Sequence, residues 1–335
     1  MTVNMAMWRK ALTAMPHMER SEWDRLDIVA KWLVSTRAAA LVITIIPCLI
    51  VALLAIRAGR FDPTLWAITT FGLVMAHATN NLLNDMTDYL TGVDKNNYFR
   101  TQYGVQPIEA GLMSVRQNLA YAAATGLVAL ACGAYLVETR GGPTIWLVSV
   151  GAFFVLFYTW PLKHIGMGEI AVFLVWGPLM IAGAYFVVTG EWGWRILSAS
   201  LPYGLGAGSV IFGKHIDKYE ADKAKGIHTL PVLLGEKMSR YCTIGIMAAQ
   251  YIFVVALVIT GSFGLSLLLV FLALPSFGRA LQAYKRPRPI WPPANYPASA
   301  WPLWHVSFSF VHNRTFGFWF LVGLSVDVIL HRFPL

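Results

Sequence analysis

Apolar runs long enough to cross a lipid bilayer recur along almost the whole of this 335-residue chain. A transmembrane helix needs roughly 20 mostly apolar residues to span about 30 Å of hydrocarbon. Nine stretches meet or approach that length: 37–56, 64–83, 117–137, 144–160, 168–189, 194–213, 241–260, 263–284 and 315–333. The sequence therefore predicts an all-α, polytopic membrane protein with about nine transmembrane helices.

The overall composition supports a membrane protein and a simple domain organisation. Only 13% of the residues are charged, whereas a soluble globular domain carries roughly 25% charged residues. Residues 1–36 contain charges and lack the apolar core of a cleavable signal peptide. We predict a cytoplasmic or interfacial arm over 1–36, followed by a single transmembrane domain over 37–335.

The formal net charge of +9 follows the expected membrane topology. Of the 26 lysines and arginines, 21 lie in the N-terminal arm or near the ends of spans that would face the same side. Positive charge accumulates on the cytoplasmic side of membranes. We therefore predict a cytoplasmic N-terminus in a bacterial inner (cell) membrane, a lipid environment around the bundle, and no nucleic-acid partner.

A polar stretch, NNLLNDMTDYLTGVD (80–94), ends the second predicted span. On a helix, Asn81, Asn84, Asp85 and Asp88 are separated by three or four residues and share one face. Carboxylates beside or within a membrane are costly and normally face a polar cavity or a partner charge. Such a cluster fits three roles: an ion-coupling site in a transporter, a structural network paired to arginines, or a Mg²⁺ site.

A second charged stretch, GKHIDKYEADKAKGIHTLPVLLGE (213–236), follows the sixth predicted span. It interleaves acidic side chains with lysines: Asp217, Glu220, Asp222, Lys214, Lys218, Lys223 and Lys225. Spans 2 and 6 both end on the predicted cytoplasmic side, so the two acidic clusters are expected at the same membrane surface. Carboxylates and lysines together can enclose a Mg²⁺-bridged diphosphate. A cation transporter has less use for these lysines, because they repel its cargo.

These motifs resemble those of the UbiA superfamily of intramembrane prenyltransferases, over roughly residues 30 to 330. The first matches the form NxxNDxxDxxxGxD: Asn81, Asn84, Asp85, Asp88, Gly92 and Asp94. The second has the form DxxxGxxTL and begins at Asp222. A third element, YTWPLKHIGMGEIAVFLVWGPLMIAGAYFVVTG (158–190), is similar to the branch that prenylates 1,4-dihydroxy-2-naphthoate in menaquinone synthesis.

The resemblance implies a helical bundle around a central cavity that opens to the cytoplasm, and Mg²⁺ ions that hold a polyprenyl diphosphate between the acidic motifs. Loss of diphosphate leaves an allylic cation, which an electron-rich aromatic acceptor attacks. The implied metal ligands are Asp85, Asp88, Asp217 and Asp222, and the implied diphosphate-binding residues are Asn81, Asn84, Lys95, Arg100, Lys163, Lys214 and Lys218. Tyr158 is a candidate for cation–π stabilisation of the allylic cation, and His215 for a base toward the acceptor phenol.

The second motif departs from the pattern NNxRDxxxDxxxGKxTL of the naphthoate branch. Aligned on Asp222 and Gly226, the chain has Asp217 where arginine is expected and Lys218 where the first aspartate is expected. On a helix, this moves the carboxylate about 100° around the axis. Asp217 can then be a metal ligand only if the helix is distorted or has already ended. Glu220 is an alternative ligand. The Lys218 ammonium could also replace the charge of one metal ion.

The function predicted from sequence is Mg²⁺-dependent prenyl transfer to an aromatic acceptor, with 1,4-dihydroxy-2-naphthoate or a related quinone precursor first. Other acceptors stay open: 4-hydroxybenzoate, homogentisate, a chlorophyll precursor, or a glycerol or sugar phosphate. A lipid or ion transporter is the alternative from another class. The lysines of the second cluster and the lack of an evident internal repeat count against transport.

Overall fold

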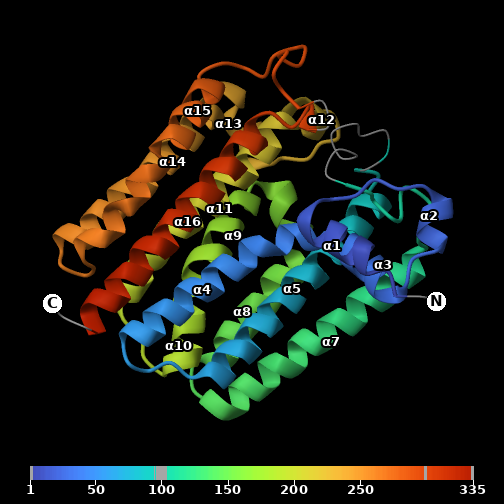
Figure 1. Cartoon of the computed structure of the whole chain (residues 1–335). Helices are drawn as coiled ribbons and strands as arrows, with labels where there is room; N and C mark the ends of the chain where they lie inside the picture. The colour runs from blue at the N-terminus through green and yellow to red at the C-terminus, as the bar shows by residue number, and fades with distance from the viewer. Residues whose placement is uncertain (1–2, 94, 96–103, 298–299, 333–335) are drawn as a thin grey trace.

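The computed structural model describes all of the chain except residues 1–2, 94, 96–103, 298–299 and 333–335 (Figure 1). Every regular element of the described residues is helical, and the long helices form one bundle. The predicted all-α membrane fold is therefore confirmed.

Seven helical segments of the described chain are long and apolar enough to cross a membrane: Ala38–Arg57, Val115–Arg140, Gly168–Thr189, Trp194–Asp217, Glu236–Ile259, Leu265–Tyr284 and His305–His331. Four of these are, or contain, one long α-helix: α4 (Val42–Arg57), α7 (Val115–Arg140), α11 (Trp194–Asp217) and α14 (Glu236–Ile259). A fifth is α16 (His305–Arg332). Each corresponds to a span predicted from sequence.

The other two segments are assembled from shorter pieces. The fifth predicted span contains α9 (Gly168–Leu174), a π-helical stretch (Val175–Gly183) and α10 (Ala184–Thr189). Pro178 lies inside the π-helical stretch and lacks the backbone N–H that a regular α-helix requires. The eighth predicted span joins a 3₁₀ stretch (Leu265–Ala273) to α15 (Leu274–Tyr284).

The two remaining predicted spans correspond to α5 (Pro63–Leu90) and α8 (Thr144–Phe157). Helix α5 is long, with 28 residues, but its second half is polar. Helix α8 is strongly apolar but has only 14 residues. The total of nine spans thus stays a prediction.

Helix α16 begins at His305, ten residues before the predicted span. Histidine, asparagine and arginine side chains in residues 305–314 concealed its first turns. His312 and Asn313 are buried against the neighbouring helices, and the His312 imidazole Nε2 lies 3.0 Å from the Tyr251 hydroxyl. Burial among partners allows polar residues inside the bundle that a count of apolar residues rejects.

The main core lies between α4, α10, α11, α14 and α16, with Ile50, Tyr203 and Phe316 fully buried in it. Large apolar side chains also cover the outside of the bundle. Trp146, Ile252 and Leu127 are 72%, 68% and 66% exposed. An apolar exterior of this kind suits contact with lipid tails.

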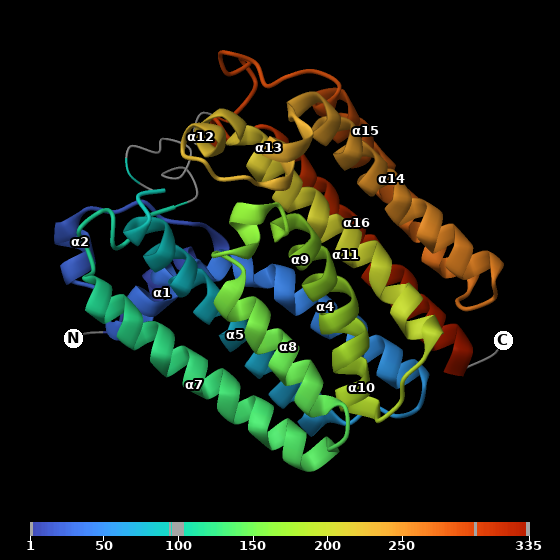
Figure 2. The same ribbon diagram turned by 180° about the vertical axis from the view of Figure 1, so that it is seen from behind.

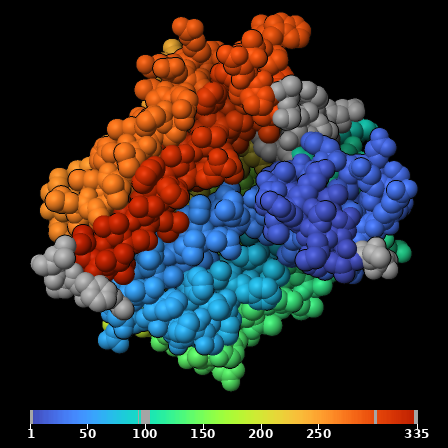
Figure 3. All heavy atoms as spheres, in the orientation of Figure 1, coloured from blue at the N-terminus to red at the C-terminus, as the bar shows by residue number. Residues whose placement is uncertain are grey.

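The N-terminal arm folds against one end of the bundle. It contains α1 (Met5–Thr13), α2 (Arg20–Asp24) and α3 (Ile28–Ser35), and Figure 3 shows it in dark blue beside α4. The Asp27 carboxylate caps α3 by accepting from Ala30 N at 2.9 Å and also binds the Trp8 indole of α1. Apolar side chains of the arm pack against the segment around Leu112.

The short helices gather at the same end. Helices α12 (Tyr219–Ala224) and α13 (Leu230–Leu234) lie side by side next to the end of α11 (Figure 2), and the turn Leu162–Ile165 reaches α5 through Lys163, whose Nζ lies 2.7 Å from Asp88 Oδ1. The His228 amide donates to the His164 carbonyl at 3.2 Å, which joins the loop after α12 to the turn before α9. This end therefore collects segments that are far apart in the sequence.

Candidate functional site

Helix α5 carries the first acidic motif without interruption as far as Leu90. Asn84, Asp85 and Asp88 are buried, with the two aspartates each 1% exposed. Asn84 donates from Nδ2 to the Thr159 hydroxyl at 3.1 Å, and Asn81 donates from Nδ2 to the Thr36 carbonyl at 2.8 Å. The helical spacing predicted from sequence thus places these side chains inside the protein.

Asp85 and Asp88 of the first motif each form an ion pair with a cation that is largely buried. Arg37 Nη2 lies 3.1 Å from Asp85 Oδ1, and Lys163 Nζ lies 2.7 Å from Asp88 Oδ1. Lys163 was predicted from sequence, whereas Arg37 was counted only among the topology charges. The backbone of Arg37 has a φ of 54°. This left-handed conformation is uncommon outside glycine, and it forms a sharp turn before Ala38 that directs the Arg37 side chain toward Asp85.

The second acidic motif lies where α11 ends and α12 begins. Lys218 stands between the two helices, and its Nζ is 2.9 Å from Asp222 Oδ1. Both side chains are almost fully buried. Asp222 Oδ2 is also buried and makes no hydrogen bond with any described residue, so one carboxylate oxygen of this pair has unused acceptor capacity.

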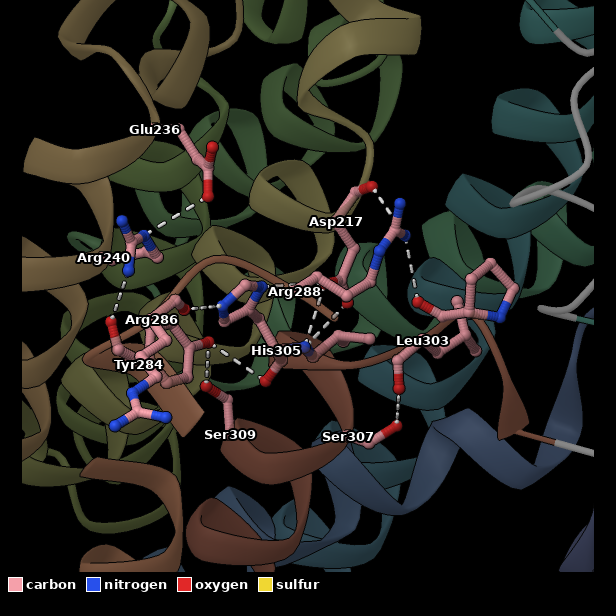
Figure 4. Close-up of polar contacts among 12 residues, drawn as sticks. Asp217, Glu236, Arg240, Tyr284, Arg286, Arg288, Leu303, His305, Ser307 and Ser309 are labelled. Carbon is pink, nitrogen blue, oxygen red and sulfur yellow. Dashed lines mark hydrogen bonds and ion pairs between the residues drawn. The ribbon is translucent and has the colours of Figure 1, made fainter. Parts of the chain in front are cut away.

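Asp217 points in a different direction and caps the start of α16 (Figure 4). Its Oδ1 accepts from the His305 amide at 2.9 Å and lies 3.0 Å from His305 Nδ1, while Oδ2 accepts from the Val306 amide at 3.0 Å. Both oxygens are therefore used by α16. The helix has ended at Asp217, as a ligand role requires, yet its carboxylate serves the N-terminus of another helix.

Two contacts bring the acidic motifs together. Lys225, three residues after Asp222, donates from Nζ to the carbonyls of Gly92, Val93 and Lys95 at 3.1, 2.6 and 2.8 Å. These carbonyls lie at the end of the first motif and directly after it. The loop after α12 is therefore fastened to the end of α5.

His164 lies within electrostatic range of both motifs. Burial and the nearby Lys163 ammonium lower the pKa of the His164 imidazole, while Asp88 and Asp222 oppose that shift. Neither the position of His164 nor its influence on the site was predicted from sequence.

A cavity of about 470 Å³ lies inside the bundle next to these ion pairs. Its lining is mainly apolar and comes from α4, α5, α7, α8, the segment 168–189 and α11. The lining includes six polar residues near the motifs: Arg37, Asn80, Asn81, Asn84, Tyr158 and Lys214. The three paired aspartates are not among the described lining residues, so cations and amides form the polar mouth of the cavity.

The remaining predicted site residues have varied outcomes. Lys95 is exposed, and Arg100 and Asp94 lie outside the described residues. His215 is buried and its Nδ1 is 2.6 Å from Glu169 Oε1, a partner that the sequence analysis did not identify. The Glu169 carboxylate restrains the ring, and a base role for His215 stays a prediction.

The donor set suits a cation that also receives ligands from a substrate. Across the described ranges, no three His, Cys, Asp or Glu side chains form a ready-made metal cluster. Mg²⁺ is often held by one or two carboxylates together with substrate phosphate oxygens and water. The unused buried oxygen of Asp222 fits such a partial shell, and both Asp222 and the α5 residue Asp88 act electrostatically on His164.

Known proteins were compared with the chain. A profile of the UbiA prenyltransferase family matches residues 44–296. The 1,4-dihydroxy-2-naphthoate octaprenyltransferase of Bacillus subtilis is 25% identical over 252 residues, covering 74% of this chain and 80% of that protein. The 2-carboxy-1,4-naphthoquinone phytyltransferase of Synechocystis is 24% identical over 229 residues, covering 66% of this chain and 72% of that protein.

The fold has a counterpart among solved structures. The structure of a UbiA homologue from Archaeoglobus fulgidus bound to GPP and Mg²⁺ matches with a TM-score of 0.55 at 16% identity. The match covers 88% of this chain and 99% of that one. At this identity the likeness concerns the arrangement of helices.

Proposed function

The chain belongs to the UbiA prenyltransferase family, and from that premise we propose that it transfers a polyprenyl group from a polyprenyl diphosphate to an aromatic acceptor in a Mg²⁺-dependent reaction. It is an integral membrane enzyme. The observation that carries the proposal is the set of three buried carboxylate–cation pairs beside an apolar cavity: Arg37–Asp85, Lys163–Asp88 and Lys218–Asp222.

The diphosphate is proposed to bind among these pairs. Arg37, Lys163 and Lys218 supply charge-assisted hydrogen bonds to its oxygens, with Lys214 and the amides of Asn81 and Asn84 at the cavity mouth. Asp85, Asp88 and Asp222 would hold Mg²⁺, which supplies positive charge against the developing charge of the leaving group. Asp217 is not carried forward as a ligand, because both its oxygens cap α16.

The reaction proposed at this site breaks the bond between prenyl C1 and the diphosphate oxygen, and both electrons leave with the diphosphate. A ring carbon of the acceptor donates an electron pair to C1 and forms the new carbon–carbon bond. The ring then loses a proton, or carbon dioxide where the attacked carbon carries a carboxylate. The buried cations stabilise the leaving diphosphate, which is commonly the largest electrostatic contribution to such a step.

The cavity is proposed to receive the prenyl tail and the acceptor ring. Its mostly apolar lining suits a hydrocarbon chain. Tyr158 lies in the lining at the end of α8, and its ring face is proposed to stabilise the allylic cation. A dry apolar wall also protects that cation from water.

The proposed acceptor is 1,4-dihydroxy-2-naphthoate or a related quinone precursor. Support comes from the names of two relatives, which act on naphthoate-type or naphthoquinone compounds, and from the third sequence element at 158–190. With that acceptor, the enzyme would act in quinone (menaquinone) biosynthesis. The excess of positive residues near one end of the bundle supports a cytoplasmic N-terminus and a cytoplasm-facing site in the bacterial inner membrane.

Mass spectrometry of membranes that contain the protein tests the proposal. The membranes receive a polyprenyl diphosphate, a panel of acceptors led by 1,4-dihydroxy-2-naphthoate, and either Mg²⁺ or EDTA. A prenylated naphthoquinol that forms with Mg²⁺ and not with EDTA is the expected result. A different prenylated acceptor would overturn the acceptor assignment alone, and product formation in EDTA would overturn the metal assignment.

A further inference from the structure

A single imidazole, that of His77, lies in the wall of the cavity below the polar mouth, among the described lining residues. It belongs to the same face of α5 as Asn81 and Asp85. With a rise of about 1.5 Å per residue, His77 lies about 6 Å deeper than Asn81 and about 12 Å deeper than Asp85 along the helix. His77 is thus one to two helical turns below the proposed diphosphate site.

The His77 ring is held in place from two sides. Its Nδ1 is 2.8 Å from the Thr44 hydroxyl of α4. The Trp176 ring meets it edge-on, with ring centroids 5.3 Å apart and an interplanar angle of 83°. One nitrogen is therefore used for orientation, and the flat ring is packed against an aromatic neighbour.

The second nitrogen of His77 is available to a ligand. Nε2 makes no hydrogen bond with any residue that the structure describes. It is also absent from the described atoms that are both fully enclosed and without a partner, so Nε2 keeps some accessible surface. Since His77 lines the cavity, Nε2 faces open space. Nearby polar side chains are used elsewhere: the Thr79 hydroxyl donates to the Met75 carbonyl at 2.8 Å, and Asn80 Nδ2 donates to the Val155 carbonyl at 2.9 Å.

The chemistry of the two substrates decides which of them suits this nitrogen. A hydrocarbon tail packed over His77 would leave Nε2 without a hydrogen-bond partner and away from water, which is unfavourable for a polar atom. A 1,4-diol carries two hydroxyls para to each other, so one lies next to the attacked ring carbon and the other lies one position further around the ring. That hydroxyl can donate to Nε2 or accept from it, so it matches either tautomer of the imidazole.

We propose that His77, oriented by Thr44 and Trp176, binds the remote hydroxyl of a hydroquinone-type acceptor. This inference rests on the proposed function and narrows its substrate class to aromatic rings with two oxygens on opposite sides. His77 then determines acceptor specificity, because a monohydroxy ring would leave the imidazole unpaired in an apolar cavity. The acceptor ring lies between the cavity mouth and His77, and the prenyl tail follows the remaining apolar wall.

A comparison of two acceptors with the full-length protein in lipid nanodiscs tests this inference. The acceptors are 1,4-dihydroxy-2-naphthoate and 1-hydroxy-2-naphthoate, which lacks the second hydroxyl. We expect His77→Phe to reduce the preference for the diol, measured as the ratio of kcat/KM values, by roughly 5- to 150-fold. The lower intrinsic reactivity of the monohydroxy ring affects both proteins equally and cancels in this ratio.

Three further variants keep the test decisive. His77→Gln retains a hydrogen-bonding group and is expected to retain part of the preference, and Thr44→Val, which frees the ring, is expected to lose part of it. Thr69→Val is the matched control. It removes a hydroxyl from another described position in the same cavity wall and is expected to leave the acceptor preference unchanged. Thermal unfolding of each variant in nanodiscs establishes that the preference is measured on folded protein.

The outcomes separate this inference from the proposed function. Normal prenylation of the diol with an unchanged preference in His77→Phe and His77→Gln would overturn the inference alone. A raised KM for the polyprenyl diphosphate with unchanged acceptor preference would overturn it as well, because the tail would then contact His77. Failure of folded wild-type protein to prenylate either naphthoate would overturn the proposed acceptor and this inference together.

Discussion

Both ends of the helical bundle contain largely buried ion pairs, but the pairs differ in whether every carboxylate oxygen has a described hydrogen-bond partner. At the end that holds the acidic motifs, Asp222 pairs with Lys218 and keeps one buried oxygen without a described hydrogen bond. At the opposite end, Arg57 Nε lies 2.6 Å from Asp327 Oδ2, and Asp327 Oδ1 accepts from the Gly264 amide at 2.6 Å. The Arg57 guanidinium also packs over the Phe263 ring at 4.9 Å.

The opposite end uses its charges to join chain segments. The Arg57–Asp327 pair connects α4 to α16 and to the loop before residue 265. Arg140 similarly donates to the carbonyls of Val187 and Val188, both at 2.8 Å. A buried ion pair by itself is therefore weak evidence for a functional site; an oxygen with unused capacity beside a cavity is the more informative feature.

The largest expected effect concerns turnover at the mouth. Asp88→Asn and Asp222→Asn should each reduce kcat by about 10³-fold, a loss of roughly 4 kcal/mol of transition-state stabilisation. The asparagine keeps the shape of the side chain and removes its charge. Quantitative assay of prenylated product with Mg²⁺ present measures the effect, and thermal unfolding in detergent should show folded protein.

Glu220→Gln is the matched control for these variants. Glu220 lies two residues before Asp222 but is exposed, so its neutral variant should retain most activity. Full activity of Asp88→Asn and Asp222→Asn would show that the mouth pairs are structural, like those at the opposite end.

The next largest effect concerns stability at the opposite end. Asp327→Asn should lower the free energy of unfolding by about 2 kcal/mol, because it leaves the Arg57 guanidinium, whose side chain is only 16% exposed, without a counter-charge. Turnover per folded molecule should stay near that of the wild type, since the pair lies far from the cavity mouth. Denaturation in detergent with activity normalised to folded protein measures both quantities. A large loss of turnover without loss of stability would contradict the division of roles between the two ends.

The last effect is of similar size and concerns Asp217. This residue lies in the second charged stretch, but its carboxylate joins chain segments, as the Arg57–Asp327 pair does at the opposite end. Asp217→Ala removes the acceptors of the His305 and Val306 amides and should destabilise the protein by about 2 kcal/mol. Turnover should fall far less than in Asp222→Asn. Parallel measurement of unfolding and of the Mg²⁺ concentration for half-maximal activity separates the two roles. A strongly raised Mg²⁺ requirement in Asp217→Ala would restore Asp217 as a ligand.

The first acidic motif was predictable because it lies on one regular helix. Spacing of three and four residues fixed the shared face of Asn81, Asn84, Asp85 and Asp88. The structure buries the last three of these side chains and places Asn81 in the cavity lining. Their partners were less accessible to sequence reasoning. Arg37 is 48 residues from Asp85. The turn that directs Arg37 inward depends on its left-handed backbone conformation, which no local sequence pattern predicts.

The second motif was harder to read because its helix ends inside it. Lys218 falls at the junction of α11 and α12, so helical spacing does not relate Asp217 to Asp222. The direction of Asp217 depends on the start of α16, which lies 88 residues later in the chain. The span predicted from sequence began at residue 315, ten residues after the start of α16 at His305. The need for a capping residue at His305 was therefore not predicted.

The sequence by itself determined that this chain is a helical membrane protein with two acidic clusters, because apolar length and helical period are local properties of the chain. Only the tertiary structure decided which cation meets each carboxylate, that Asp217 serves α16, and that His77 faces a cavity. These are contacts between segments far apart in the sequence. They depend on how whole helices pack against each other, which no local pattern encodes.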